Sequence, residues 1–337
     1  MQLSEYDLGF RFKKNTFTVS GLMDRYEEGG ISLYPDHIYS KPWSNRAKSI
    51  FIESIIVGMP TAEIWCEESG YGEISVLDGT QRIQSIIDFC KNNFSLSSLK
   101  LLPGLEDSYF EDLPYRFKST FLNRAELYFT IISYDTHPSL KFELFKRINS
   151  HSRFPVQAAR NFAFRDHFNF IRHTQEHCED IIAPEEHFNF LSPRIGYIQA
   201  ANYDELFLLI SALTLSINDE IEANQPYEDF LDAAAMTIHF RSVGTDALLS
   251  DIIKYLGRIK RALGKKILFD TSFSSARRRM LSTRLDDLKL TSSQIADLYI
   301  LALRHEINHA SVGDVIETGR TKLPMRSSRY YYRQLFG

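Results

Sequence analysis

The stretch Glu73-Ile74-Ser75-Val76-Leu77-Asp78-Gly79-Thr80-Gln81-Arg82 decides the fold of the first half of the chain. Its apolar, β-branched start predicts a strand, and the glycine after Asp78 allows a tight turn. The apolar spacing that follows predicts a helix over about residues 80–90. The first turn of such a helix presents backbone N–H groups that bind anions. The stretch therefore predicts a strand that ends in a carboxylate beside a phosphate site.

Three side chains of this turn suit phosphate chemistry. The guanidinium of Arg82 can donate two parallel hydrogen bonds to one phosphate. Gln81 can orient a water molecule or a phosphate oxygen, and Asp78 can hold Mg²⁺, which prefers carboxylate and phosphate oxygens. The alternative is purely structural, because Asp78 could cap the helix and Arg82 could pair with a surface carboxylate.

The first half of the chain reads as a small mixed α+β domain. Ser44 is expected to cap a helix that runs to Val57 and ends at Gly58 and Pro60. Short β-branched or aromatic runs bounded by Gly, Pro, Asp or Asn predict strands. These strands are Phe17 to Val19, Ile31 to Tyr34, Ile64 to Cys66, Glu73 to Leu77 and Leu127 to Ser133.

The second half reads as all-helical, with no strand expected after Ser139. A capping box at Thr291 and Gln294 begins the last helix, which is expected to reach His309. We place the domain boundary between residues 137 and 138, giving domains 1–137 and 138–337. The expected helices cover residues 139–149, 156–164, 166–178, 203–217, 227–240, 246–263, 274–288 and 292–309.

Further motifs surround the Asp78 turn in a fixed order. They are Trp43, Lys48, residues 52–60 (IESIIVGMP), residues 94–96 (FSL), residues 110–114 (FEDLP), residues 144–150 (LFKRINS) and Arg160. Together they resemble the N-terminal domain of GmrSD-type, modification-dependent restriction endonucleases, whose signature is Asp-Gly-Gln-Gln-Arg. The resemblance covers about residues 15–165.

The resemblance implies a ParB/sulfiredoxin-like fold that binds a nucleoside triphosphate with Mg²⁺. It implies NTP hydrolysis, a sensor or regulatory role in restriction or anti-phage defence, and DNA and a separate nuclease or defence subunit as partners. The implied catalytic residues are Asp78, which is also the metal ligand, Gln81 and Arg82. The implied nucleotide-binding residues are Gly79, Thr80, Lys41, Trp43, Arg147 and Asn149.

Two positions depart from the family pattern. Thr80 stands where the family has the first glutamine of its pair, and the Gln-Arg that usually precedes Trp43 is absent. Lys41 could replace that arginine, but as a point charge without the planar fork. Hydrolysis therefore stays open, and the alternative is a non-enzymatic nucleic-acid-binding or protein-interaction module that keeps the fold.

Basic residues gather late in the chain, although the net charge is −4. Cations interleaved with aromatic rings suit nucleic-acid backbones or single strands. The alternative is a solvated helix face with a tail that docks on protein. The residues assigned to nucleic acid are Arg277, Arg278, Arg279, Arg326, Arg329 and Tyr331, and a further cluster is Lys254, Arg258, Lys260, Arg261, Lys265 and Lys266.

The sequence His305-Glu306-Ile307-Asn308-His309 matches the His-Glu-x-x-His pattern of zinc hydrolases. On a helix, this spacing places two imidazoles on one face with a glutamate as general base. No later histidine completes an extended zinc motif, so polar residues on a helix surface are the alternative. A zinc hydrolase is the most distant functional hypothesis.

The remaining features predict a cytoplasmic protein with no membrane segment. The three cysteines, Cys66, Cys90 and Cys178, form neither a paired framework nor a Cys-x-x-Cys metal site. The first residues have no apolar core typical of a signal peptide. The longest apolar run, Leu206 to Ile217, is shorter than the roughly 20 residues of a membrane span. Self-association is left open by the sequence.

Overall fold

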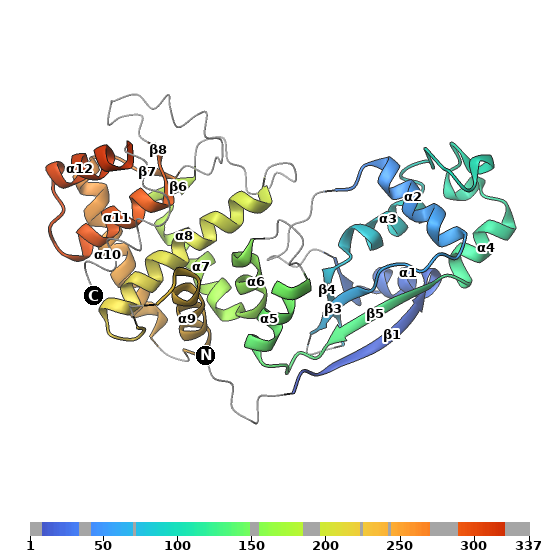
Figure 1. Cartoon of the computed structure of the whole chain (residues 1–337), viewed down its shortest axis with the longest axis horizontal. Coiled ribbons are helices and arrows are strands. Elements are labelled where there is room, and N and C mark those ends of the chain that lie inside the picture. Colours follow the sequence, from blue (N-terminus) through green and yellow to red (C-terminus); the bar gives the residue numbers. More distant parts are fainter. Residues whose placement is uncertain are drawn as a thin grey trace. The chain divides into compact units, whose positions relative to one another are not determined.

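The computed structural model describes residues 9–33, 42–69, 72–148, 155–184, 196–222, 225–241, 244–269 and 289–320. The chain divides into two compact units, Met1–Leu144 and Phe145–Gly337. The boundary between them falls inside helix α5 (Pro138–Ile148). The two units are drawn in Figure 1, and each is considered by itself.

The first unit contains a five-stranded mixed sheet with the strand order β1-β5-β3-β4-β2. β1 pairs with β5 and β3 with β4 in antiparallel fashion, whereas β5–β3 and β4–β2 are parallel. The expected α+β class with a small mixed sheet is confirmed. The strands are β1 (Phe12–Thr18), β2 (Ile31–Ser32), β3 (Ile64–Glu68), β4 (Ile74–Asp78) and β5 (Glu126–Ile132).

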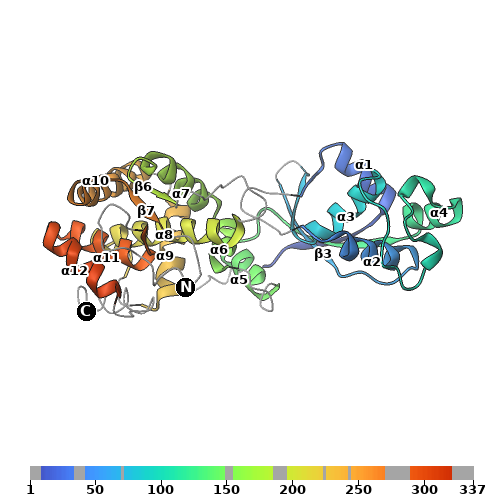
Figure 2. The same ribbon diagram turned by 90° about the horizontal axis from the view of Figure 1, so that it is seen from above.

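Four α-helices of the first unit share one hydrophobic core with the sheet. Alternate residues of the central strands, such as Ile64 and Cys66 or Ile74 and Val76, are buried in this core, as the two-residue period of a strand requires. α2 and α3 contact each other and lie side by side in both views (Figures 1 and 2). The helices are α1 (Val19–Glu27), α2 (Asn45–Ile56), α3 (Thr80–Cys90) and α4 (Tyr115–Asn123), with short 3-10 helices η2 (Pro103–Leu105) and η3 (Phe110–Asp112).

Two expectations for this unit are confirmed in detail and two elements were missed. Ser44 caps α2, since its Oγ accepts a hydrogen bond from the Ala47 N–H at 3.3 Å. α3 spans the residues that the sequence predicts. α1 was missed because its first residue, Val19, reads as the end of a strand, whereas Thr18 caps a helix there. α4 was missed because Pro114 reads as a loop residue, although proline is also common at helix starts.

The second unit is mostly helical. Its centre is α8, whose segment Ala200–Ile217 is long and apolar enough to cross a membrane but is 83% buried inside the unit. One such helix is weak support for a membrane span, because core helices share this composition. The helices are α6 (Val156–Ala163), α7 (Arg165–Cys178), α8 (Gly196–Ile217), α9 (Tyr227–Phe240), α10 (Thr245–Leu263), α11 (Ser292–Leu303) and α12 (His309–Arg320).

The expectation of no strand after Ser139 is wrong. A small parallel sheet with the order β6-β7-β8 joins Ile182–Pro184, Ile267–Phe269 and Lys289–Leu290. Strands of two or three residues are too short for a two-residue period to appear in the sequence. Parallel pairing also joins residues that are far apart along the chain, so no turn motif marks it. The expected helix over residues 274–288 lies outside the described residues.

Candidate functional site

The Asp78 turn has the backbone geometry that the sequence predicts. β4 ends at Asp78, and Gly79 adopts a φ of +108° before α3 begins at Thr80. A Cβ atom on Gly79 would lie 3.0 Å from Cγ1 of Ile64, so Ile64 would have to move by a few tenths of an ångström to make room for it. Glycine is therefore required here for both its φ and its size. Asp78 follows Ile74 and Val76 in register, so it emerges at the end of the strand on the core side of the sheet.

Arg82 is held by the protein itself. Its Nη2 donates to Oδ2 of Asp78 at 2.6 Å, and its Nη1 donates to the carbonyl oxygens of Ala62 and Glu63 at 2.6 and 2.8 Å. The Arg82 side chain is only 13% exposed, whereas that of Asp78 is 41% exposed. The guanidinium thus ties the segment before β3 to the end of β4. Asp78 makes no cap hydrogen bond with α3, so its carboxylate stays open to solvent beside the helix start.

Gln81 and Thr80 also form hydrogen bonds to segments that lie far away in the sequence. Oε1 of Gln81 accepts a hydrogen bond from the backbone N–H of Trp43 at 2.8 Å. The Trp43 ring packs edge-on against Phe51 of α2, with 5.7 Å between ring centres. The hydroxyl of Thr80 donates to the carbonyl oxygen of Leu33 at 3.2 Å and is buried. Thr80, which departs from the family pattern, therefore links α3 to the chain just after β2.

The remaining predicted nucleotide-binding residues are not gathered at this turn by the described structure. Lys41 and Asn149 lie outside the described residues. Arg147 lies in the last turn of α5, in the second unit, so its place in the pocket stays a prediction. The structure does bring Trp43 to the first turn of α3, through its hydrogen bond to Gln81.

A metal ion at this turn would need ligands from the nucleotide in addition to those of the protein. Within the described ranges, no group of three or more His, Cys, Asp or Glu side chains could hold a metal. Asp78 alone offers a half-exposed carboxylate. One carboxylate with bound phosphate oxygens and water is a normal Mg²⁺ environment, so the residues present fit a magnesium–nucleotide complex but not a metal bound by protein alone.

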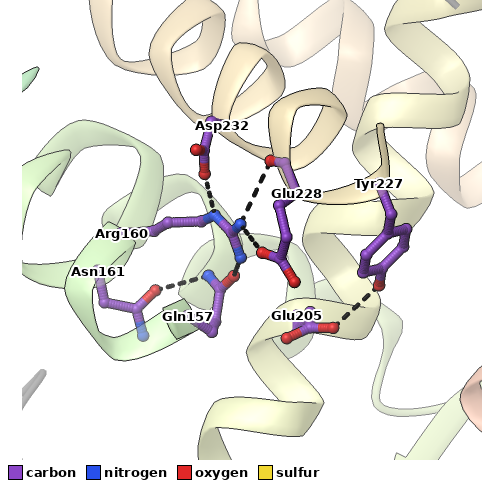
Figure 3. Close-up of polar contacts among 7 residues, drawn as sticks. All are labelled: Gln157, Arg160, Asn161, Glu205, Tyr227, Glu228 and Asp232. Carbon is purple, nitrogen blue, oxygen red and sulfur yellow. Dashed lines mark hydrogen bonds and ion pairs between the residues drawn. The ribbon is translucent and has the colours of Figure 1, made fainter. Parts of the chain in front are cut away.

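A second polar site lies inside the helical unit, and the sequence reading did not assign it. The guanidinium of Arg160, in α6, is fully buried. Its Nε donates to Asp232 at 2.7 Å and its Nη2 to the Glu228 carboxylate at 2.5 Å, both in α9 (Figure 3). Its Nη1 reaches Oε1 of Gln157 at 3.3 Å. Two of these three hydrogen bonds join α6 to α9, and the third stays within α6.

The same network continues from α6 to α7 and α8. The Asn161 amide donates to Oδ2 of Asp204 at 2.7 Å, and Gln175 donates to Oδ1 of Asp204 at 2.8 Å. Burial raises the pKa of the Asp204 carboxyl, and Arg172 and the two amides oppose this shift. Nearby, Tyr227 donates to Glu205 at 2.9 Å (Figure 3). The cluster is satisfied by its own members, as a structural network is.

One member of this region lacks partners. His167 of α7 is fully buried, and neither ring nitrogen has a hydrogen-bond partner among the described residues. Burial, with smaller contributions from Arg160 and His239, lowers the pKa of His167 to about 3 against an opposing effect of the Phe164 backbone. The imidazole is therefore neutral in the folded unit at physiological pH.

The His-Glu-x-x-His segment is not helical, so the zinc expectation is wrong. α11 ends at Leu303, and His305 takes a φ of +60°. The N–H of His305 bonds to the carbonyl oxygen of Ala302 and that of Glu306 to Leu301, which is the Schellman termination of a helix. Asn308 then caps α12, accepting from the Ser311 N–H at 2.8 Å. The break removes the helical spacing on which two zinc-binding imidazoles depend.

The residues assigned to nucleic acid lie outside the described residues, so that assignment stays a prediction. They are Arg277, Arg278, Arg279, Arg326, Arg329 and Tyr331.

Sequence signals existed for the buried network. Gln157, Arg160 and Asn161 recur at three- and four-residue spacing on α6, which otherwise consists mainly of apolar residues. Asp204 likewise lies in α8, just before the apolar run that begins at Leu206. Polar residues at helical spacing inside apolar helices indicate a buried network, and this pattern was available from the sequence.

Comparison with known proteins gives one match. A family model described as the GmrSD restriction endonuclease, N-terminal domain, matches residues 39–154. The matched range contains Trp43, the Asp78 turn and Arg147, and it ends before Arg160. No curated protein and no solved structure matches the chain.

Proposed function

Because residues 39–154 match the model of the GmrSD restriction endonuclease N-terminal domain, we propose that the protein binds a nucleoside triphosphate at the Asp78 turn. In this proposal it is a sensor or regulatory component of a DNA-modification-dependent restriction or anti-phage system. The family match supports a role in restriction or defence and an interaction with DNA. The proposal extends this role to a bound nucleotide, its hydrolysis and a separate nuclease subunit.

The geometry of the turn carries this proposal. The N-terminus of α3 follows Gly79, whose φ of +108° turns the chain from the end of β4 into the helix. A helix start attracts phosphate through its N–H groups and its dipole. The half-exposed Asp78 stands directly beside it. A bound Mg²⁺ would neutralise phosphate charge, with Asp78 as its protein ligand.

Arg82 then acts first as a positioning residue. Its bonds to the Ala62 and Glu63 carbonyls fix the guanidinium, and its bond to Asp78 fixes the carboxylate. With Asp78 as the ligand of a magnesium–nucleotide complex, Nη2 of Arg82 would be able to donate to a phosphate oxygen in place of Asp78. This exchange keeps every charge paired, because the phosphate replaces Asp78 as the partner of the guanidinium.

The second candidate function is an interaction module without turnover. It is favoured by the use of Thr80, Gln81 and Arg82 in structural hydrogen bonds, which leaves Asp78 as the open side chain of the motif. Such a module would bind DNA or a protein partner and respond to nucleotide weakly or not at all.

Thermal unfolding of the full chain separates these candidates. With each of the four ribonucleoside triphosphates and Mg²⁺ at about 100 times Kd, a specific ligand stabilises the native state by roughly 3 kcal/mol and raises Tm. We expect a rise with at least one nucleotide and no rise without Mg²⁺. Phosphate release, measured with modified and with unmodified DNA, then distinguishes hydrolysis from binding alone. No rise with any nucleotide would leave the interaction module as the function.

A further inference from the structure

The helical unit has an open depression of about 410 Å³ that the proposed nucleotide site does not include. It is formed by the last turns of α10, the α11–α12 turn and the start of α12, and these three helices contact one another (Figure 1). Its lining residues are Arg258, Arg261, Ala262, His305, Ile307, Asn308 and His309.

The α10 side of the depression is a stripe of cations. Lys254, Arg258 and Arg261 follow one another at four- and three-residue spacing, so they lie on one face of the helix. Nη1 of Arg258 donates to the carbonyl oxygen of Ala302 at 3.0 Å, which fixes its side chain against the end of α11. The Arg258 guanidinium also lies 5.5 Å from the ring centre of Tyr255. One arginine is thus held in place, while Arg261 is exposed.

The opposite side is built by the helix break. Because α11 ends in a left-handed residue at His305, both His305 and His309 reach the depression from the turn. The cap of α12 by Asn308 directs the positive end of that helix toward the same place. The two histidines that resemble a zinc motif in sequence therefore line the same depression as Arg258 and Arg261 in the fold.

Among the described residues, no carboxylate balances the charge of the two arginines in this depression. None of its seven lining residues is acidic. Within the part of the chain that the structure describes, neither Arg258 nor Arg261 pairs with a carboxylate. The nearest acid along the turn, Glu306, is 60% exposed and lies 3.8 Å from Arg304. Two arginines without counter-ions beside a helix start favour an anion with several oxygens.

We propose that this depression, defined by Arg258, Arg261, His305 and His309, binds a backbone phosphate of double-stranded DNA. The inference deepens the proposed function, since it rests on a role in a DNA-directed restriction system. DNA fits better than a small phosphate because the cationic stripe continues beyond the depression to Lys254. The chain after α12 also carries Lys322, Arg326, Arg329 and Arg333 with no acid. An extended polyanion satisfies both features.

Fluorescence anisotropy of a labelled duplex of about 20 base pairs with the full chain tests the proposal. Arg258→Gln with Arg261→Gln is expected to weaken binding at least about tenfold and to reduce the salt slope by roughly 1–2. The matched control is Lys260→Gln with Lys266→Gln, which removes the same charge from the same segment outside the depression. Equal affinity and equal salt slope in both double variants would overturn the proposal.

A second variant controls for a folding defect in the first one. Arg261→Gln with His309→Gln changes two exposed side chains and leaves the Arg258 bond to Ala302 in place, and we expect it to weaken duplex binding as well. Inorganic phosphate and ATP serve as competitors. If either one displaced the duplex from the protein, the depression would be a site for small phosphates, which would contradict the proposal. Asp78→Asn should keep duplex affinity while losing the nucleotide response, so failure at this surface is distinguishable from failure at the Asp78 turn.

Discussion

The two units each contain an arginine bonded to carboxylate, and the two pairs differ in what they leave available. In the first unit, Arg82 is largely covered but its partner Asp78 is 41% exposed at the end of a strand. In the second unit, Arg160 is fully covered and donates to two carboxylates, Asp232, which is 21% exposed, and Glu228, which is 53% exposed. Asp78 therefore has one cationic partner and an open side, whereas the buried guanidinium of Arg160 depends on two carboxylates of the protein for its charge balance.

This difference shows that a charged motif must be judged by the burial of its cation and by the number of carboxylates that this cation holds. Removing one member of a buried pair leaves an uncompensated charge and costs far more than removing a member of an exposed pair. Arg160 is therefore expected to control the stability of the helical unit. Asp78 is expected to control ligand binding with little effect on stability.

The largest expected effect is at Arg160. Arg160→Leu leaves Asp232 and Glu228 without their cation and should lower the free energy of unfolding by about 3–5 kcal/mol. Arg11→Leu is the exposed counterpart, because Arg11 pairs with Asp135 at the surface, and should cost about 1 kcal/mol or less. Denaturant unfolding measures both. Equal losses in the two variants would remove the contrast between the buried and exposed pairs.

Gly79 tests whether the Asp78 turn is as constrained as its geometry indicates. Gly79→Ala combines an unfavourable φ with a Cβ only 3.0 Å from Ile64 and should cost about 2–4 kcal/mol. Gly58→Ala is the control, since Gly58 has a φ of +79° but open space around it, and should cost about 1 kcal/mol. Urea unfolding of each variant gives the difference. A loss at Gly79 no greater than at Gly58 would mean that Ile64 moves aside.

His167 makes the helical unit sensitive to acid. Its pKa is about 3 in the folded chain and ordinarily about 6.5, so the unfolded chain takes up the proton first. Its contribution to stability is complete above pH 6.5 and is lost as the pH falls toward 3. Between pH 7 and 5 this loss is about 2 kcal/mol.

Comparison of His167→Gln with wild type isolates this contribution from the buried carboxyls, whose raised pKa values act in the opposite direction. Unfolding free energies at pH 7, 6 and 5 should fall less steeply in His167→Gln. His177→Gln, at an exposed position of the same helix, should keep the wild-type slope. An unchanged slope in His167→Gln would mean that this imidazole is not the acid-sensitive group.

The smallest expected effect is at Thr80. Thr80→Val removes the hydroxyl that bonds to Leu33 and leaves that carbonyl without this donor, at a cost of about 1 kcal/mol. Thr80→Ser keeps the hydroxyl and should recover part of the loss. Thermal unfolding of both variants measures this. A Thr80→Val variant as stable as wild type would free Thr80 for a direct role at the nucleotide.

The sequence predicted the parts of the fold that local rules determine. The bounds of α3, the Ser44 cap and the capping box at Thr291 follow from glycine, hydroxyl and apolar spacing, and all are confirmed. The helix break at His305 was missed because a left-handed residue other than glycine has no strong sequence signal. The Asn308 cap was a local signal that could have revealed it.

The sequence predicted only those parts of the candidate site that are formed by neighbouring residues along the chain. The strand, turn and helix around Asp78 are local, so their order was readable. The bonds of Arg82 to Ala62 and Glu63, and of Gln81 to Trp43, join segments about 20 to 40 residues apart. Such contacts depend on how β3 and α2 pack beside β4, which spacing alone does not determine.

Calorimetric titration of magnesium–nucleotide into the full chain tests the central claim most directly. Wild type and Asp135→Asn, which alters a similarly exposed aspartate that also pairs with arginine, should bind with equal affinity. Asp78→Asn keeps the shape and a hydrogen-bond acceptor for Arg82 but removes the charge, and it should weaken binding at least about tenfold. Equal affinity in all three proteins, or no binding by wild type, would contradict a nucleotide site at the Asp78 turn.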